Sequence, residues 1–467
     1  MPPDLRALDE THLGAWLAGQ RWFGAKGREV ASTSILEAIV LAPGDPALAL
    51  AVAEARFAAG THELYQLLLA LSAGRAAGED DVGAVDGFVA REALAEPAAA
   101  AALARLLRDE ATVTAGQAGQ VVFRWLDEER AIAAEPSVRA MGAEQSNSSV
   151  VIDDAFVLKV FRRVEAGVNP ELEMLRFLTD HGFDAVAPLA GWYDLESALV
   201  DATLGVVQRY VHGGRDGWER VVEALADGRG EDVLDDLGEL GSVIGRMHTV
   251  LASEGTDPAF APEEPGDESL SLLTATIDEE IERVFLDLPR DEPALQPIAG
   301  RGPEVRDRLA LLTHVAARGR LIRHHGDLHL GQTMLVTSDP ERRWIVLDFE
   351  GEPARPLLER RRKRSPLRDV AGMLRSFAYA ASASELQRGV AAPAGWEDAA
   401  RERFLKGYFD TVEPSLLPPG QGAATTLLTV FELEKAVYEL RYEVDNRPDW
   451  VSIPVAGIAR LLEEPIA

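Results

Sequence analysis

The chain has 467 residues, of which 47% are hydrophobic and 27% are charged, and it contains no cysteine. This length predicts two to three domains with sizeable cores. The absence of cysteine excludes disulfides, thiolate metal sites and cysteine nucleophiles. The net charge of −30 disfavours binding to nucleic acid or to anionic membranes. The sequence has no run of 18 apolar residues, so no membrane span is predicted. The beginning, "MPPDLRALDE", has no apolar signal segment, so we expect a cytoplasmic protein.

The first part of the chain predicts a mixture of strands and helices. Residues 34–43, 48–57 and 62–71 have strand character, and residues 98–110 predict a helix. From about Gln117 the composition changes to β-branched runs, at 119–126, 148–164 and 204–214. Between them, 169–182 predicts a helix with Asn169 as its cap and Pro170 at its first position. A strand that carries a lysine, a helix that carries acids and further strands together predict a small α/β lobe.

After His212 the chain becomes mostly helical. Residues 232–253, 367–381 and 427–447 predict helices, and 255–268 predicts an acidic, proline-rich loop. The string "HHGDLHLGQ" follows a predicted helix and precedes a short strand, and the buried strand after it ends in "LDFEGEP".

These two strings carry the candidate chemistry. Transfer of a γ-phosphoryl group needs a neutralised nucleotide, an oriented acceptor hydroxyl and a group that accepts its proton. Asp327 is suited to the last two tasks. Gln332 lies five residues later and Asp348 lies at the end of the following strand, so both can offer oxygen to Mg²⁺. The spacing therefore predicts a magnesium-dependent phosphotransferase.

This constellation resembles the aminoglycoside-phosphotransferase-like branch of the protein-kinase fold. The strings "EQSNSSVV", "VLKVFRRV", "NPELE", "HGDLHLGQ", "DFEGEP", "SPLRDVAGMLRSFAYAA" and "NRPDW" resemble the actinobacterial maltokinase family, and "QRWFGAKGRE" resembles the start of its N-terminal cap. Related glucosamine kinases share much of the pattern, and both families stay open. The resemblance implies an α+β, bilobal protein-kinase-like fold. Its parts would be a cap subdomain (1–115), a β-rich nucleotide-binding subdomain (116–211) and a mostly helical lobe with the catalytic loop and sugar pocket (212–467).

The resemblance also implies roles for individual residues, with ATP and Mg²⁺ as cofactors. Asp327 would be the catalytic base, Gln332 and Asp348 the Mg²⁺ ligands, and Lys159 the contact to the nucleotide phosphates. Glu173 would pair with Lys159, and Glu171 is the competitor that spacing does not exclude. Further nucleotide contacts would come from a loop between strands and from the junction of the lobes: Gln145, Ser146, Asn147, Ser148, Ser149, Gln208 and Tyr210.

The sugar pocket is expected at the helix 427–447. Lys435, Tyr438, Glu439 and Tyr442 share one helical face by their spacing, and they offer both hydrogen bonds and an aromatic surface. An amphipathic packing helix would present the same pattern, so that alternative stays open. The expected substrate contacts are His329, Glu350, Lys435, Tyr438, Glu439, Tyr442, Asn446 and Trp450.

Three further features have structural interpretations. We expect His325 and Asp369 to brace the catalytic loop without reacting. The run Arg360 to Arg364 is expected to be solvated or paired with acids, since a chain of this charge disfavours nucleic acid.

The function predicted is an ATP-dependent sugar kinase that converts maltose to maltose 1-phosphate for α-glucan and glycogen synthesis. A glucosamine kinase is the alternative. A catalytically inactive protein that binds a partner, such as a trehalose-synthase-type enzyme, is the alternative of another class. The presence of Asp327, Gln332, Asp348 and Lys159 favours an enzyme.

Overall fold

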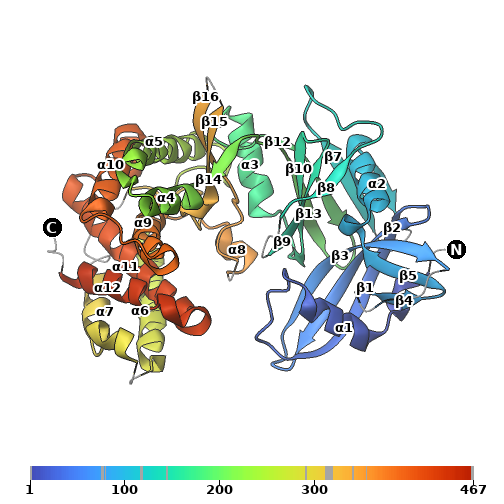
Figure 1. The fold of residues 1–467 in the computed structure, drawn as a ribbon, viewed down its shortest axis with the longest axis horizontal. Coiled ribbons are helices and arrows are strands. Elements are labelled where there is room, and N and C mark those ends of the chain that lie inside the picture. Colours follow the sequence, from blue (N-terminus) through green and yellow to red (C-terminus); the bar gives the residue numbers. More distant parts are fainter. Residues whose placement is uncertain are drawn as a thin grey trace. The chain divides into compact units, whose positions relative to one another are not determined.

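The computed structural model describes residues 3–74, 78, 80–115, 119–142, 146–289, 292–310, 319–338, 341–353 and 355–463. The chain divides into two compact units (Figure 1). The first unit comprises Met1–Thr179 and Ala187–Val211, and the second comprises Asp180–Val186 and His212–Ala467. No helix among these described residues is long and apolar enough to cross a bilayer.

The first unit begins with an antiparallel sheet of order β1-β2-β3-β5-β4, with β11 paired to β3. Its elements are η1 (Leu5–Ala7), α1 (Glu10–Gly19), β1 (Val30–Ala42), β2 (Ala47–Phe57), β3 (His62–Ala73), β4 (Gly83–Val85), β5 (Phe88–Glu92), η2 (Ala93–Ala95) and α2 (Pro97–Arg108). The predicted strands at 34–43, 48–57 and 62–71 and the predicted helix at 98–110 are confirmed. Strand β2 is buried on both faces. Its small residues, such as Ala49 and Ala51, pack with Leu13 and Leu17 of α1, whereas Leu50 and Val52 pack with Leu103 of α2.

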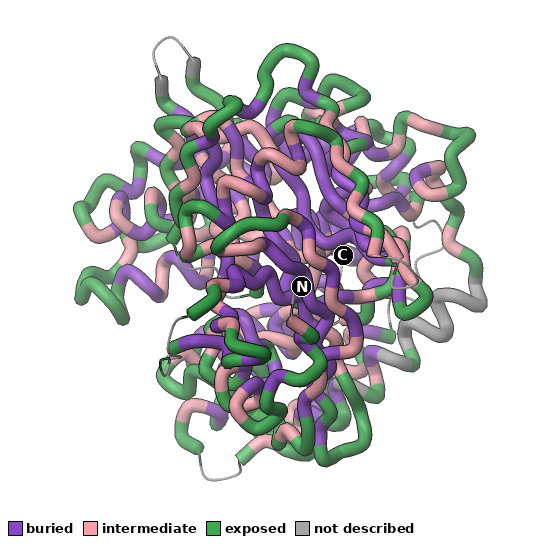
Figure 2. Tube along the Cα trace, turned by 90° about the vertical axis from the view of Figure 1, so that its right-hand side faces the viewer, coloured by how far each residue is buried: buried purple, intermediate pink, exposed green. Residues whose placement is uncertain are grey.

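The second sheet of this unit has the order β6-β7-β12-β13-β10-β9-β8. Its elements and the neighbouring helix are β6 (Thr112–Thr114), β7 (Gln120–Trp125), β8 (Val138–Ala140), β9 (Asn147–Ile152), β10 (Phe156–Phe161), β11 (Arg163–Val164), α3 (Pro170–Asp180), β12 (Leu189–Glu196) and β13 (Asp201–Arg209). One hydrophobic core joins the two sheets, because Leu50 and Val52 belong to the same cluster as Phe123 and Tyr193. Figure 2 colours the buried residues of the chain purple and the exposed ones green.

The second unit combines helices with a small sheet of order β14-β15-β16. Its elements are β14 (Gly214–Asp216), α4 (Gly217–Ala226), η4 (Gly230–Val233), α5 (Leu234–Leu251), α6 (Asp267–Asp287), η5 (Pro293–Ile298), α7 (Gly302–Ala310), η7 (Leu330–Gln332), β15 (Thr333–Ser338), β16 (Glu341–Val346), α8 (Leu357–Arg360), α9 (Leu367–Arg388), α10 (Trp396–Thr411), η8 (Pro414–Leu416), α11 (Gln421–Asn446), η9 (Pro448–Trp450) and α12 (Ser452–Glu463). Helices α5 and α10 approach closely at Gly241 and Gly407, where a Cβ atom would collide with the backbone of the facing helix.

The hairpin β15–β16 brings the two motif strings together. Thr333, the first residue of β15, pairs with Val346, the last residue of β16. A further hydrogen bond fixes the end of β16, because the amide of Val346 donates to Ala185 O at 2.8 Å. The residue before β15 and the residues after β16 therefore lie side by side, although they are about fifteen positions apart in the sequence.

Candidate active site

A buried carboxylate holds the loop that carries Asp327. Asp369, in the first turn of α9, accepts hydrogen bonds from the amides of His325 (2.8 Å) and Gly326 (2.9 Å). His248 Nε2 lies 3.0 Å from the same carboxylate. Burial alone would raise the pKa of Asp369, but the neighbouring histidines outweigh it and hold that pKa well below its usual range. The prediction that Asp369 braces the loop is confirmed.

His325 connects the loop to the strand end opposite it. Its Nε2 lies 2.8 Å from Leu347 O, and its ring packs against Phe349 with centroids 4.9 Å apart. The side chain is buried, so it holds the segment before Asp348 in place. The predicted structural role of His325 is confirmed as well.

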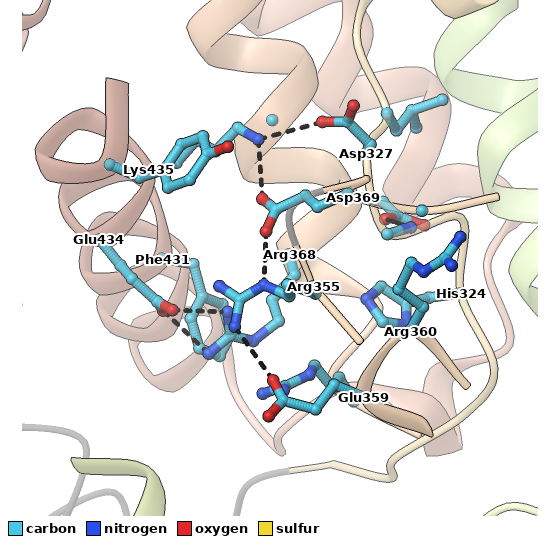
Figure 3. A pocket seen from close by; sticks show the side chains of 17 residues that line it. His324, Asp327, Arg355, Glu359, Arg360, Arg368, Asp369, Phe431, Glu434 and Lys435 are labelled. Carbon is cyan, nitrogen blue, oxygen red and sulfur yellow. Dashed lines mark hydrogen bonds and ion pairs between the residues drawn. The ribbon is translucent and has the colours of Figure 1, made fainter. Parts of the chain in front are cut away.

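Asp327 lies in a pocket with a cation beside it (Figure 3). Lys435 Nζ is 3.2 Å from Asp327 Oδ1 and 3.1 Å from Glu352 Oε1. Burial by itself would lower the pKa of Lys435, yet the two carboxylates outweigh it and raise that pKa. Burial would raise the pKa of Glu352, but Lys435 and Arg355 lower it to about 2. Lys435 and Glu352 are therefore both charged at neutral pH, and a protein ammonium already lies between two carboxylates of the pocket.

The two predicted metal ligands lie next to each other. Gln332 Nε2 donates to Asp348 Oδ2 at 3.2 Å, and the amide of Leu347 donates to Gln332 O at 2.9 Å. Asp348 has φ +59°, a left-handed conformation that is costly for a residue with a side chain and that is common at functional sites. With its nitrogen on Asp348, Gln332 would bind a cation through Oε1. A carboxylate and an amide oxygen suit Mg²⁺.

His329 and Glu350 flank these residues. His329 Nδ1 accepts from the amide of Gly331 at 3.1 Å and so closes the turn η7. Burial lowers the pKa of His329, which keeps the ring neutral. The backbone carbonyl of Glu350 accepts from Arg360 at 3.1 Å. Neither residue lines the pocket around Asp327, so their expected contact with sugar stays a prediction.

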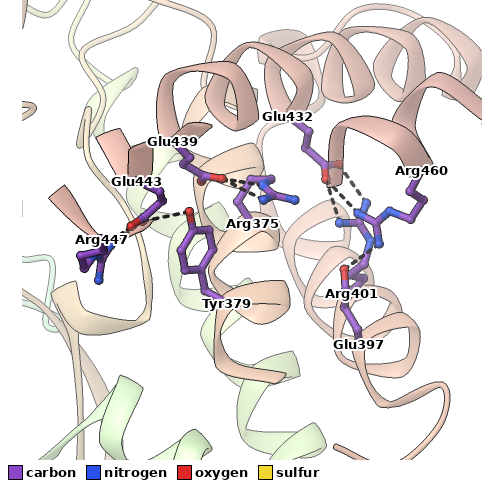
Figure 4. A network of polar contacts seen from close by, with 9 residues as sticks. All are labelled: Arg375, Tyr379, Glu397, Arg401, Glu432, Glu439, Glu443, Arg447 and Arg460. Carbon is purple, nitrogen blue, oxygen red and sulfur yellow. Dashed lines mark hydrogen bonds and ion pairs between the residues drawn. The ribbon is translucent and has the colours of Figure 1, made fainter. Parts of the chain in front are cut away.

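Helix α11 contributes only part of its predicted sugar-binding face. Lys435 and Tyr438 line the pocket, with Lys435 Nζ 5.1 Å from the Tyr438 ring centroid. Glu439, Tyr442, Asn446 and Trp450 do not line it. Burial raises the pKa of Glu439, whose carboxylate is used inside the unit: it pairs with buried Arg375 at 2.8 Å (Figure 4). Of these six residues, only Lys435 and Tyr438 share the pocket with Asp327, and the expected sugar contacts of the other four stay a prediction.

The trailing residues instead contact one another. Tyr442 is 44% exposed, and its carbonyl accepts from Asn446 Nδ2 at 2.9 Å. The Trp450 ring stacks with Tyr379 at a centroid distance of 6.1 Å, and Arg447 lies over it at 4.8 Å. These contacts fit the alternative of a packing helix for this segment.

In the first unit, Lys159 forms the predicted ion pair with a glutamate of α3, but the partner is Glu171 and not Glu173. Lys159 Nζ is 2.6 Å from Glu171 Oε2, and both side chains are buried. Asn169 Oδ1 accepts from the Glu171 amide at 2.8 Å, which confirms the predicted cap and fixes the first turn of α3. Residues two positions apart point to different helix faces, so Glu171 faces β10 and half-buried Glu173 does not share that direction. The expected pairing with Glu173 is wrong.

The polar stretch before Lys159 is mostly strand and not loop. Asn147, Ser148 and Ser149 lie in β9, where Ser149 pairs directly with Lys159. Ser148 Oγ accepts from Arg162 Nε at 2.8 Å, and Ser146 Oγ accepts from Asn147 Nδ2 at 3.2 Å. Gln145 lies outside the described residues. The expected phosphate-covering loop is thus wrong for positions 147–149. These residues continue the strand formed by the β-branched residues after them, and they pair with β10.

Gln208 and Tyr210 lie at the end of β13. Gln208 Nε2 donates to Ala187 O at 3.2 Å, and the Tyr210 amide donates to Ala155 O at 2.8 Å. An adenine at this segment would therefore need backbone groups other than the Tyr210 amide.

The pocket also contains residues that were not foreseen as site residues. They are charged and follow Asp348 in sequence or lie on α11: Glu352, Arg355, Glu359, Arg364, Arg368 and Glu434. Most belong to strings already noted, "DFEGEP" and the run Arg360 to Arg364. The expectation of a solvated or acid-paired run holds for Lys363, which is 2.7 Å from Glu263, and for exposed Arg362. Arg360 and Arg364 line the pocket, which the sequence did not predict.

Comparison with known proteins fits this arrangement. The model of the phosphotransferase enzyme family matches residues 137–405, more than half of the chain. The chain belongs to this family. The model described as the maltokinase N-terminal cap domain matches residues 16–104. The predicted phosphotransferase activity on a hydroxyl acceptor and the predicted kinase-like fold with an N-terminal cap are confirmed.

Several relatives of this phosphotransferase are named glucosamine kinase. One, from Streptacidiphilus jiangxiensis, is 27% identical over 337 residues, covering 70% of this chain and 74% of the relative. Another, from Mycolicibacterium smegmatis (strain ATCC 700084 / mc(2)155), is 26% identical over 342 residues, covering 70% and 80%. The structure of a glucosamine kinase in complex with glucosamine, ADP and inorganic phosphate has a TM-score of 0.70 at 22% identity, covering 99% of this chain and 100% of that one. This likeness shows a shared fold.

Proposed function

We propose that this phosphotransferase is an ATP- and Mg²⁺-dependent sugar kinase that phosphorylates maltose at its anomeric hydroxyl. The observation that carries the proposal is Lys435, whose ammonium lies within 3.2 Å of Asp327 and of Glu352. The match to a maltokinase N-terminal cap domain adds support. The product, maltose 1-phosphate, would feed α-glucan and glycogen synthesis in the cytoplasm, and a trehalose-synthase-type enzyme is the expected supplier of maltose.

The charge of the pocket favours a neutral sugar. An ammonium substrate needs a carboxylate that is not already neutralised. The carboxylates beside the pocket are paired with protein cations: Glu352 with Lys435 and Arg355, and Glu434 with Arg368 at 2.8 Å. A second ammonium next to Lys435 would be repelled by it. The hydroxyls of a neutral disaccharide can instead donate to the carboxylates and accept from Lys435.

The residues of the chain divide the work of the reaction as follows. Asp327 would orient the acceptor hydroxyl and accept its proton, on a loop that Asp369 and His325 keep rigid. Lys435 would hold the Asp327 carboxylate in one position and donate to the acceptor oxygen. Tyr438 offers an aromatic face to the sugar ring from the same helix.

The cofactor residues fit the proposed nucleotide and metal. Gln332 and Asp348 offer two adjacent oxygens of the kind that Mg²⁺ takes. Lys159, fixed by Glu171, would contact the phosphates. MgATP supplies the phosphoryl group and the neutralisation of its charge when bound.

A glucosamine kinase is the second candidate, and it is favoured by the names of the relatives at 26–27% identity. An ADP-release assay with maltose, glucosamine and glucose separates the two, with Asp327→Asn as the inactive control. Turnover with maltose that is abolished in the variant supports the proposal. Turnover with glucosamine alone refutes the choice of sugar but not the kinase activity.

A further inference from the structure

One half of the pocket in the second unit is rich in arginine. Arg355, Arg360, Arg364 and Arg368 line it together with His324, and Figure 3 shows those of them that it labels below Lys435 and Asp327. They come from the loop after Asp348, from α8 and from the start of α9. Such a concentration of cations is notable in a chain whose net charge is −30.

Two of these arginines have acidic partners. Arg355 Nε is 2.5 Å from Glu352 Oε2, and Arg368 Nη2 is 2.8 Å from Glu434 Oε2. A third acid, Glu359, also lines the pocket, and its Oε2 lies 3.7 Å from Arg355 Nη1. The first two pairs keep the arginine half rigid, because each pair ties a loop residue or α9 to a fixed neighbour.

Arg364 differs from its neighbours. Its backbone is fixed, since its amide and carbonyl both pair with Ile322 at 2.9 Å. Its guanidinium makes no hydrogen bond or ion pair within the described part of the chain. Burial, together with Arg368 and Arg355, lowers the pKa of Arg364 to about 10, so the group is still charged at neutral pH. A fixed, partly buried positive charge therefore lines the pocket without a carboxylate in ion-pair contact among the described residues, and Glu434 and Glu359 act on it only from a distance.

His324 adds a second polar group in the same condition. Its side chain is 9% exposed, and its Nδ1 has no hydrogen-bond partner among the residues that the structure describes. An unsatisfied buried polar atom lowers stability unless a ligand or water meets it. Among the described residues, the Arg364 guanidinium and the Nδ1 of His324 thus both lack a hydrogen-bond partner in the same half of the pocket.

We propose that this arginine half, centred on Arg364 and His324, binds a phosphate group on the acceptor side of the active site. A planar carboxylate offers two oxygens in one plane, whereas a phosphate offers three or more oxygens to donors that come from several directions. The donors here come from separate segments, and the arginine fork matches phosphate oxygens. The phosphate is carried either by a sugar phosphate or by free inorganic phosphate. Because Asp327 lies in the same pocket, bound phosphate competes with the sugar acceptor, a consequence that rests on the proposed function.

Isothermal titration of the full chain tests the site without nucleotide, metal or turnover. The probes are inorganic phosphate and an α-hexose 1-phosphate, at constant ionic strength set by chloride, with glucose as the neutral control. Arg364→Gln should raise the Kd for phosphate about tenfold or more, as expected for a lost charge-assisted contact. Arg362→Gln is the matched control from the same run, because Arg362 is exposed and does not line the pocket, and it should change the Kd less than twofold. Tighter binding of the hexose phosphate assigns the site to a sugar phosphate, and equal binding assigns it to free phosphate.

The proposal is overturned if wild type binds neither probe at about 10 mM, which would mean a Kd weaker than the millimolar range. It is also overturned if Arg364→Gln binds the probes as tightly as wild type does. Circular dichroism checks that each variant is folded. Should Arg364→Gln fail to fold, Arg364→Lys keeps the charge but loses the fork, and it should weaken binding severalfold; unchanged affinity in that variant overturns the proposal too. Because no turnover is measured, a failure here leaves the sugar-kinase proposal standing, and the reverse also holds.

Discussion

Replacing Lys435 by Met removes the cation that lies between Asp327 and Glu352. At 3.2 Å and an effective dielectric constant of about 20, each ion pair amounts to about 5 kcal/mol before desolvation is subtracted. The side chains are 12% to 25% exposed, so water screens part of this energy. The loss of Lys435 leaves Asp327 and Glu352 close together with only Arg355 beside Glu352, and we expect the free energy of unfolding to fall by about 3 kcal/mol.

The same substitution should lower kcat/KM for the sugar about 100-fold, equivalent to about 2.7 kcal/mol, because Asp327 loses its fixed position. Urea unfolding and ADP-release assays measure the two effects. Adding Glu352→Gln to Lys435→Met removes the charge repulsion, so it should recover about half of the lost stability and none of the activity. A Lys435→Met variant with wild-type stability and wild-type kcat/KM would refute this reasoning.

Three further predictions concern other groups. Glu171→Gln should lower kcat/KM for ATP about tenfold or more while Glu173→Gln changes it less than twofold, since Glu171 pairs with Lys159; steady-state kinetics that reverse this order would contradict the assignment. Burial lowers the pKa of His324 to about 4 from an unfolded value of 6.5, so its contribution is fully present above pH 6.5 and is lost as the pH falls towards 4. Wild type should lose about 3 kcal/mol more stability than His324→Asn over that range, measured by urea unfolding between pH 7.5 and 4.5; parallel curves would count against it. Arg375→Met should cost about 3 kcal/mol by stranding Glu439, and Arg375→Met with Glu439→Leu should recover most of it, with KM for the sugar unchanged in both; a large rise in KM would place Glu439 back in the sugar site.

The catalytic half of the site was predictable because its residues are close in the chain. Asp327, Gln332 and Asp348 are linked by a short turn and one hairpin, and pairing of Thr333 with Val346 is enough to place Gln332 beside Asp348. The structural role of Asp369 was also accessible, since an acid in the first turn of a buried helix needs donors.

The sequence is least informative where the orientation of a helix decides which of its side chains meet a given partner. Glu171 and Glu173 differ by two positions, and the packing of α3 selects between them. Helix α11 has 26 residues, and a pocket spans only about two of its turns, so Lys435 and Tyr438 reach it while Tyr442 does not. The spacing of residues along a helix predicts which of them share a face, but it does not predict how much of that face lines a pocket.

The arginine run shows the same limit. Its charge pattern alone favours solvent, but α8 and the bridge between Ile322 and Arg364 turn two of its members into the pocket. That turn depends on pairing with a segment about 40 residues away, which no local pattern in the run reports.

The central claim, phosphoryl transfer from ATP to maltose through Asp327, is tested most directly by identifying the product. Phosphorus NMR of a reaction with ATP, Mg²⁺ and an equimolar mixture of maltose and glucosamine should show an anomeric phosphate ester of maltose with wild type and none with Asp327→Asn. A phosphate ester of glucosamine alone, or an ester of maltose that the variant forms at the wild-type rate, would contradict the account.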